Sequence, residues 1–116
     1  MIDRDFLRAL NERPVAFYPV YRRVTGSVTA GLLLSQLMYW FAASKADKIH
    51  KTDAEIAAET GLSEKEMKTA KRAIKGLGFI RVTREGLPAR TYYEIDWSRA
   101  PMSREEVMAG YERMIG

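Results

Sequence analysis

Residues 52–79 of the chain read TDAEIAAETGLSEKEMKTAKRAIKGLGF, and this stretch carries most of the information about the fold. Its first four residues have the S/T-x-x-E spacing of a capping box, in which the hydroxyl accepts a hydrogen bond from the third amide and the carboxylate accepts one from the cap amide. Residues 63–66 repeat this spacing. Gly61 lies between the two boxes and suits the left-handed conformation that ends a helix. We therefore predict two helices joined by a short glycine turn, the second of which ends near Gly76 or Gly78.

The second helix has two faces of different chemistry, because successive residues are about 100° apart around a helix. One face is apolar and can pack inward, and it holds Met67, Ala70, Ile74 and Leu77. The opposite face is basic, with Thr69 beside it, and it holds Lys65, Lys68, Arg72 and Lys75. Basic residues on an isolated helix are as often a solvated face as a binding face. On the second helix of a helix-turn-helix they lie where a DNA duplex would be met, which favours DNA binding.

Positive charge is concentrated in the second helix and in the segment after it. The chain of 116 residues has a formal net charge of +4, whereas residues 65–90 hold eight basic and two acidic residues, a net charge of +6. A polyanionic partner is the simplest physical reason for this asymmetry.

Two strands that form a hairpin are expected after the helices, the first over residues 79–84 and the second over residues 91–97. Alternation sets two apolar residues of the first strand opposite three of the second: Ile80 and Val82 opposite Tyr93, Ile95 and Trp97. Arg84 and Arg90 flank the turn, which contains a glycine and a proline. A hairpin with such a basic tip is suited to a groove or to the phosphate backbone of DNA.

The order of these elements resembles the winged helix-turn-helix fold. Ala57, Gly61 and Met67 match the small, glycine and apolar positions of helix-turn-helix motifs, and residues 79–96 look like the two-stranded wing. The resemblance implies a mainly α fold with a small antiparallel β-wing, which belongs to the α+β class.

Two further stretches are similar to the N-terminal winged-helix domain of phage and plasmid replication proteins. LLLSQLMYW at residues 32–40 resembles the apolar helix that precedes the motif in those proteins, and Gly-Leu-Pro-Ala at residues 86–89 resembles the end of their wing. The resemblance covers roughly residues 20–97. It implies double-stranded DNA binding by a replication-initiation or replisome-organiser module of a phage or mobile element.

The residues predicted to contact DNA lie on the second helix and on the wing. They are Ser63, Lys65, Lys68, Thr69, Lys71, Arg72 and Lys75 on the helix, and Arg84 and Arg90 on the wing. We expect the helix to enter the major groove, where Arg72 suits guanine because a guanidinium can donate two hydrogen bonds to O6 and N7. Lys65, Lys68 and Thr69 are expected near base edges. Lys71, Lys75 and the wing arginines are expected to neutralise phosphates, helped by the amides at the start of the helix.

A single domain is expected for a chain of this length. It consists of an N-terminal extension over residues 1–26, a winged-helix core over residues 27–97 and a C-terminal helix within residues 98–116. The extension is predicted to contain a short helix at Asp3–Glu12 and one or two further helical turns at Tyr21–Val24.

A long apolar helix, Val28–Ala43, is predicted to form the centre of the core, with Ser27 as its N-cap. It is apolar on most of its circumference, so it must be covered on several sides. Coverage by the N-terminal helix, the helix-turn-helix and the sheet is favoured, and a homodimer interface on one side is the alternative. A short strand at Ile49–Lys51 is expected to follow and to pair with the wing.

A third capping box, at residues 103–106, predicts a helix near the C-terminus. Its apolar side holds Val107, Met108, Tyr111, Met114 and Ile115. The sequence leaves open whether this helix folds back onto the domain, pairs with another copy in a homodimer, or leads into a linker. It likewise leaves open whether the chain is a complete small protein or a fragment.

No catalytic, metal-binding or cofactor motif is apparent in the sequence. There are no cysteines, so neither a disulfide nor a thiolate metal site can form. His50 is the one histidine and has no metal-binding or nucleophile motif beside it, and no glycine-rich phosphate loop follows a strand. We therefore expect a protein that is not an enzyme and needs no cofactor.

No targeting or membrane segment is expected either. The N-terminus lacks the apolar region of a signal peptide. The most apolar run, residues 28–43, has sixteen residues, and a helix needs ~20 to span a bilayer. These features predict a cytoplasmic protein without a membrane partner.

Three functions remain open from the sequence. The first is the DNA-binding replication module described above, and the second is a small transcriptional regulator that uses the same domain. The third is a phage-type protein that uses the winged-helix fold to bind another protein, as an inhibitor of a host factor does. The basic stretch favours the first two, although a basic face can also bind an acidic protein surface.

Overall fold

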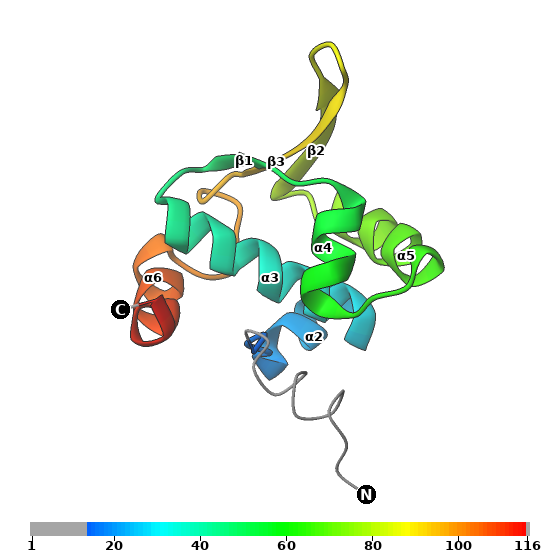
Figure 1. Ribbon diagram of the computed structural model, residues 1–116. Helices are drawn as coiled ribbons and strands as arrows, with labels where there is room; N and C mark the ends of the chain where they lie inside the picture. Colours follow the sequence, from blue (N-terminus) through cyan, green and yellow to red (C-terminus); the bar gives the residue numbers. More distant parts are fainter. Residues whose placement is uncertain (1–13, 116) are drawn as a thin grey trace, which may run out of the picture.

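The structure is a computed structural model that describes the backbone of residues 14–115 and the side chains of residues 14–112. Its elements are α2 (Pro19–Thr25), α3 (Val28–Ser44), β1 (Lys48–His50), α4 (Asp53–Thr60), α5 (Glu64–Lys75), β2 (Ile80–Glu85), β3 (Arg90–Ile95) and α6 (Arg104–Ile115). The helices form a body from which the β2–β3 hairpin projects (Figure 1). The predicted α+β class with mainly helical content is confirmed. The helix expected at residues 3–12 lies outside the described residues.

The two predicted capping boxes are present at the starts of α4 and α5. In the first, Glu55 N donates to Thr52 Oγ1 and Thr52 N donates to a Glu55 carboxylate oxygen, both at 3.0 Å. In the second, Glu66 N donates to Ser63 Oγ at 3.1 Å and Ser63 N donates to the Glu66 carboxylate at 2.9 Å. Gly61 ends α4 with a φ of 80°, in the left-handed region that favours glycine. The predicted pair of helices with a glycine turn is therefore confirmed.

Helix α3 is the centre of the body. Its buried residues include Gly31, Leu33, Ser35, Gln36 and Leu37. Because successive residues are about 100° apart around a helix, burial extends around most of its circumference. The helices α2, α4, α5 and α6 and strand β1 all contact it. Ser27 caps the helix as predicted, accepting a hydrogen bond from Ala30 N at 3.2 Å. Coverage of this apolar helix by the helix-turn-helix and the sheet is thus confirmed, and α2 and α6 cover it as well. The N-terminal helix that was expected to contribute lies outside the described residues.

Helix α2 crosses α3 at very short range. A Cβ atom placed on Gly31 of α3 would lie 2.9 Å from both Cα and N of Arg22 in α2. Such a distance is too short for carbon atoms without a shift of the backbone. Gly31 is therefore required by the close approach of the two helices.

Helix α6 folds back onto the body, which is one of the three arrangements that the sequence left open. Val107 and Tyr111 are buried in the common core. Tyr111 OH donates to the carbonyl oxygen of Ser35 in α3 at 2.8 Å. Tyr18, which precedes α2, donates from its hydroxyl to Gly110 O at 2.7 Å. These hydrogen bonds attach the C-terminal helix to two earlier parts of the chain.

The sheet has the order β1-β3-β2 and is antiparallel throughout. Ile80 pairs with Ile95 and Val82 pairs with Tyr93, so the predicted register of the hairpin is confirmed. The strands begin and end one or two residues from the predicted positions.

The prediction that Trp97 belongs to the last strand is wrong. Strand β3 ends at Ile95 because Asp96 turns the chain, its carboxylate accepting a hydrogen bond from Ser98 N at 3.0 Å. The indole nitrogen of Trp97 donates instead to Asp47 Oδ1 at 2.9 Å, in the segment before β1.

A polar network around Glu59 joins α3, α4 and the end of β1. One oxygen of the Glu59 carboxylate accepts hydrogen bonds from Gln36 Nε2 at 2.6 Å and Trp40 Nε1 at 2.7 Å, both from α3. The other oxygen lies 2.7 Å from Lys51 Nζ, which also sits 3.8 Å from the centre of a Trp40 ring. Burial would raise the pKa of Glu59, but the hydrogen bonds from Lys51, Trp40 and Gln36 together outweigh it and lower the pKa.

Replacing Gly31 with alanine is expected to lower the free energy of unfolding by about 1–3 kcal/mol, because the new methyl group forces α2 away from α3. Urea unfolding measures the change. Gly110→Ala is the matched control, since a Cβ there would meet Tyr18 OH at an ordinary 3.5 Å. The control should leave stability unchanged or raise it by up to about 1 kcal/mol through the better helix propensity of alanine. Equal stability of the Gly31→Ala variant and the wild type would contradict the close crossing.

Replacing Glu59 with glutamine is expected to lower the free energy of unfolding at neutral pH by about 1–3 kcal/mol, because charge-assisted hydrogen bonds are lost. The folded pKa of Glu59 is lowered. Its contribution is therefore complete above the unfolded pKa of about 4.3 and disappears as the pH falls through the folded pKa. The difference between wild type and variant should shrink below about pH 4.3 in urea unfolding at a series of pH values. The exposed Glu112→Gln serves as control, and a difference that does not vary with pH would argue against this role.

Candidate nucleic-acid interface

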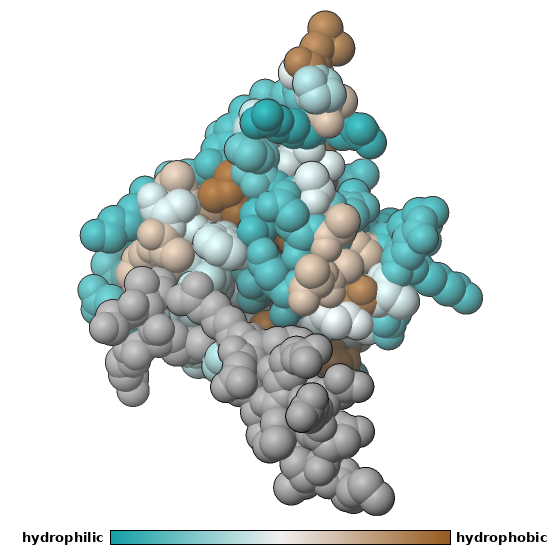
Figure 2. All heavy atoms as spheres, viewed as in Figure 1, coloured by the Kyte–Doolittle hydropathy of each residue, from teal (hydrophilic) through white to brown (hydrophobic). Residues whose placement is uncertain are grey.

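Helix α5 separates its apolar and basic side chains as the sequence predicts. Met67, Ala70 and Ile74 are buried against the core. The opposite side, here called the α5 basic face, is exposed along its whole length and consists of Lys65, Lys68, Thr69, Arg72 and Lys75. Hydrophilic side chains cover α5 at the right edge of the space-filling view (Figure 2). Burial of the inner side orients the helix, so the basic side is presented to solvent.

The four cations of the α5 basic face have no ion-pair partner among residues 14–112. The ion pairs in that part of the chain involve other cations, namely Lys48, Lys51, Lys71, Arg99 and Arg104. The positive charge of this face is therefore not neutralised by neighbouring carboxylates there. An exposed, uncompensated cluster of this kind produces a positive potential that attracts polyanions.

Lys71 is set apart from the α5 basic face by its surroundings. Its Nζ lies 2.8 and 3.0 Å from the two carboxylate oxygens of Asp53, at the start of α4. Its side chain is only 20% exposed. Lys71 thus joins α5 to α4, which the helical periodicity of α5 alone did not indicate.

The start of α5 is occupied by its own cap. The Ser63 hydroxyl and amide are both used in the capping box with Glu66. The hydrogen bond from the Ser63 amide is the main cause of the lowered pKa of Glu66, so this carboxylate stays ionised at neutral pH. With Glu64 also in the first turn, the helix start is less attractive to a phosphate than the turns that follow.

The two hairpin arginines lie on opposite faces of the sheet. Arg84 is two residues from Val82, and alternation therefore places it on the face that packs against the body. Arg90 is the register partner of Glu85, on the outer face. Glu85 also binds Lys48 Nζ at 3.0 Å. The sequence predicted one basic tip with both arginines, whereas the register places Arg84 on the face that packs against the body and Arg90 on the opposite face.

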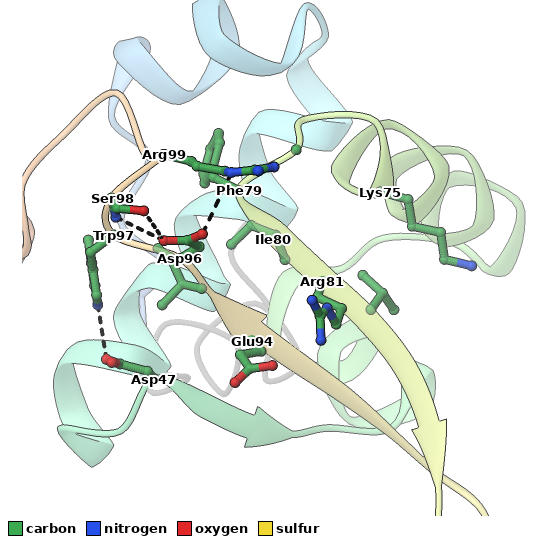
Figure 3. A pocket seen from close by; sticks show the side chains of 13 residues that line it. Asp47, Lys75, Phe79, Ile80, Arg81, Glu94, Asp96, Trp97, Ser98 and Arg99 are labelled. Carbon is green, nitrogen blue, oxygen red and sulfur yellow. Dashed lines mark hydrogen bonds and ion pairs between the residues drawn. The ribbon is translucent and has the colours of Figure 1, made fainter.

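An open hollow of about 930 Å³ lies beside the end of α5 and the start of β2 (Figure 3). Its charged lining residues are three cations and three carboxylates: Lys75, Arg81, Arg99, Asp47, Glu94 and Asp96. Arg99 lies 3.8 Å from Asp96, and Arg81 pairs in register with Glu94. This balance of charge makes the hollow a weak site for an anion. Arg81 belongs to the basic stretch of residues 65–90, but it is not among the residues predicted to contact DNA. Its position in strand β2 places it at this hollow.

His50 is exposed on β1 and its ring centre lies 5.4 Å from that of Tyr92. Among the described residues there is no group of three His, Cys, Asp or Glu side chains arranged to hold a metal ion. No helix of that part is long and apolar enough to span a bilayer.

No protein-family model, no curated protein and no solved structure matches the chain. Its function must therefore be inferred from its residues and their arrangement. The α5 basic face and the projecting hairpin are the two surfaces from which that inference starts.

Proposed function

We propose that the protein binds double-stranded DNA as a winged helix-turn-helix domain. Helices α4 and α5 are its two motif helices, and the β2–β3 hairpin is its wing. The order helix, strand, two helices and two strands, together with the sheet order β1-β3-β2, supports this proposal. The observation that carries it is the α5 basic face, with four exposed cations that have no carboxylate partner among the described residues, on the helix whose other side is buried.

Helix α5 is the element that enters the major groove. Its twelve residues make a rod of about 18 Å, which fits along a groove. Arg72 is the best guanine reader, because its exposed guanidinium can donate two parallel hydrogen bonds. Lys65, Lys68 and Thr69 lie on the same side and share the base edges, and Lys75 meets a phosphate at the end of the helix.

The phosphate contacts differ from those expected from the sequence in two places. Lys71 is bound to Asp53, so we assign it to the alignment of α4 with α5 and not to DNA. Arg84 lies on the face of the hairpin that packs against the body and is the wing residue that we assign to the DNA backbone, whereas Arg90 lies on the opposite face beside Glu85.

We assign the biological role on the resemblance of residues 20–97 to replication proteins, and propose a replication-initiation or replisome-organiser module of a phage or mobile element. A transcriptional regulator would use the same surface. Selection of bound fragments from the source genome separates the two: sites at a replication origin support the replication role, and sites at promoters support the regulator.

Titration of a fluorescent random-sequence duplex is expected to give micromolar binding that weakens steeply with salt. On random sequence no particular base is read, so the four cations of the α5 basic face and Arg84 are all expected to pair with phosphates. Four to five neutralised phosphates predict a slope of about −4 in a plot of log K against log salt concentration, or a loss of roughly 150- to 500-fold between about 50 and 200 mM. Lys68→Gln should flatten the slope by about one unit. Lys45→Gln removes an exposed cation outside the α5 basic face and should leave the slope unchanged. If the wild type fails to bind any duplex at low salt, the proposed function is wrong, and binding of an acidic protein becomes the better explanation.

Arg84→Gln is expected to weaken binding to all duplex sequences by a similar factor and to flatten the salt slope by about one unit, as loss of a phosphate contact does. Arg90→Gln should have a smaller effect, because its side chain lies on the outer face beside Glu85. The two variants are matched in chemistry and in distance from the tip of the hairpin. Equal losses for both would contradict the assignment of one face of the hairpin to DNA.

A further inference from the structure

The tip of the β2–β3 hairpin is apolar and completely exposed. All four residues of the turn, 86–89, are exposed and none is charged. Leu87 is 100% exposed, more than any other large hydrophobic residue in the described part of the chain, where Val28 follows at 61%. The tip is the hydrophobic point of the projecting hairpin in the space-filling view (Figure 2).

The geometry of the turn does not require a leucine at position 87. Gly86 has a φ of 87° and supplies the left-handed conformation that the turn needs. The position after it would ordinarily hold Asn, Asp, Ser or Gly, which hydrogen-bond to the backbone or to water. Leu87 packs against nothing in the fold, so it adds no stability through burial. A single exposed leucine is common, but this one lies at the most projecting point of the hairpin, between the exposed cations Arg84 and Arg90.

The reach of the hairpin is comparable with the spacing between adjacent grooves of a duplex. Val82 is the last residue of β2 that packs against the core. Leu87 lies five residues further on, three of them in β2 and two in the turn, so it lies at most about 16 Å beyond Val82. Half a turn of duplex, which separates the major groove from the adjacent minor groove, is about 17 Å. Arg84 lies between these two points, where the phosphate backbone would pass.

We propose that Leu87 is a wedge that enters the minor groove next to α5, partly unstacks one base step and bends the duplex. The inference rests on the proposed function and deepens it. Leucine is one of the side chains that insert between base steps in this way, and flexible steps such as TA open most readily. Insertion would remove the leucine from water, while Arg84 contacts the phosphate backbone beside the groove.

The test compares the full chain with its Leu87→Ala and Leu87→Met variants on a mixed-sequence duplex that contains several TA steps. Energy transfer between dyes on the two ends reports bending, and 2-aminopurine beside a TA step reports unstacking. The wild type and Leu87→Met should raise both signals. Leu87→Ala should bind about 3- to 10-fold more weakly, with an unchanged salt slope because no charge is lost, and should raise neither signal. Urea unfolding should show equal stability for all three, because Leu87 is outside the core.

The outcomes separate this inference from the function on which it rests. If the wild type binds the duplex but neither signal rises, or if Leu87→Ala raises both signals as much as the wild type, the wedge is wrong and DNA binding stands. If the wild type binds no duplex at low salt, the proposed function and the wedge both fail.

Discussion

The need to cover helix α3 on nearly every side organises this protein. Exposing any side of an apolar helix to water costs free energy. Five other elements of the chain contact α3. The covering contacts are specific as well as apolar: Gly31 lets α2 approach within backbone distance, Glu59 ties α4 to Trp40, and Tyr111 bonds to Ser35. Because one central helix receives all these elements, their positions are linked, and α5 is held by the same constraint.

That constraint leaves the basic side of α5 exposed. The inner side of α5 packs against the core, so the side chains on its other side face solvent. Neighbouring elements then sort the cations further. Asp53 binds Lys71 and removes it from the exposed set, and the strand register places Arg84 and Arg90 on different faces of the hairpin. The cations of residues 65–90 are therefore divided among different surfaces, and the α5 basic face is the one proposed to contact DNA.

The locally encoded features of the fold were predictable. The capping boxes, the glycine turn and the pairing of Val82 with Tyr93 depend on residues close in sequence or on simple alternation, and all are present. Trp97 was assigned wrongly to a strand, because its partner Asp47 lies fifty residues away and Asp96 ends the ladder first. The same difference holds for the candidate site. Helical periodicity identified the α5 basic face, but it did not show that Lys71 forms an ion pair with Asp53.

The sequence alone was sufficient for the identity of the helices, the hairpin and the concentration of positive charge, because capping and periodicity act over a few residues. The tertiary structure was needed to show which cations stay without a partner among the described residues, which side of the hairpin each arginine occupies, and that α6 closes over α3. The reason is physical. Ion pairs and packing faces depend on distances between elements that are remote along the chain. Those distances are fixed only when the elements have packed around α3.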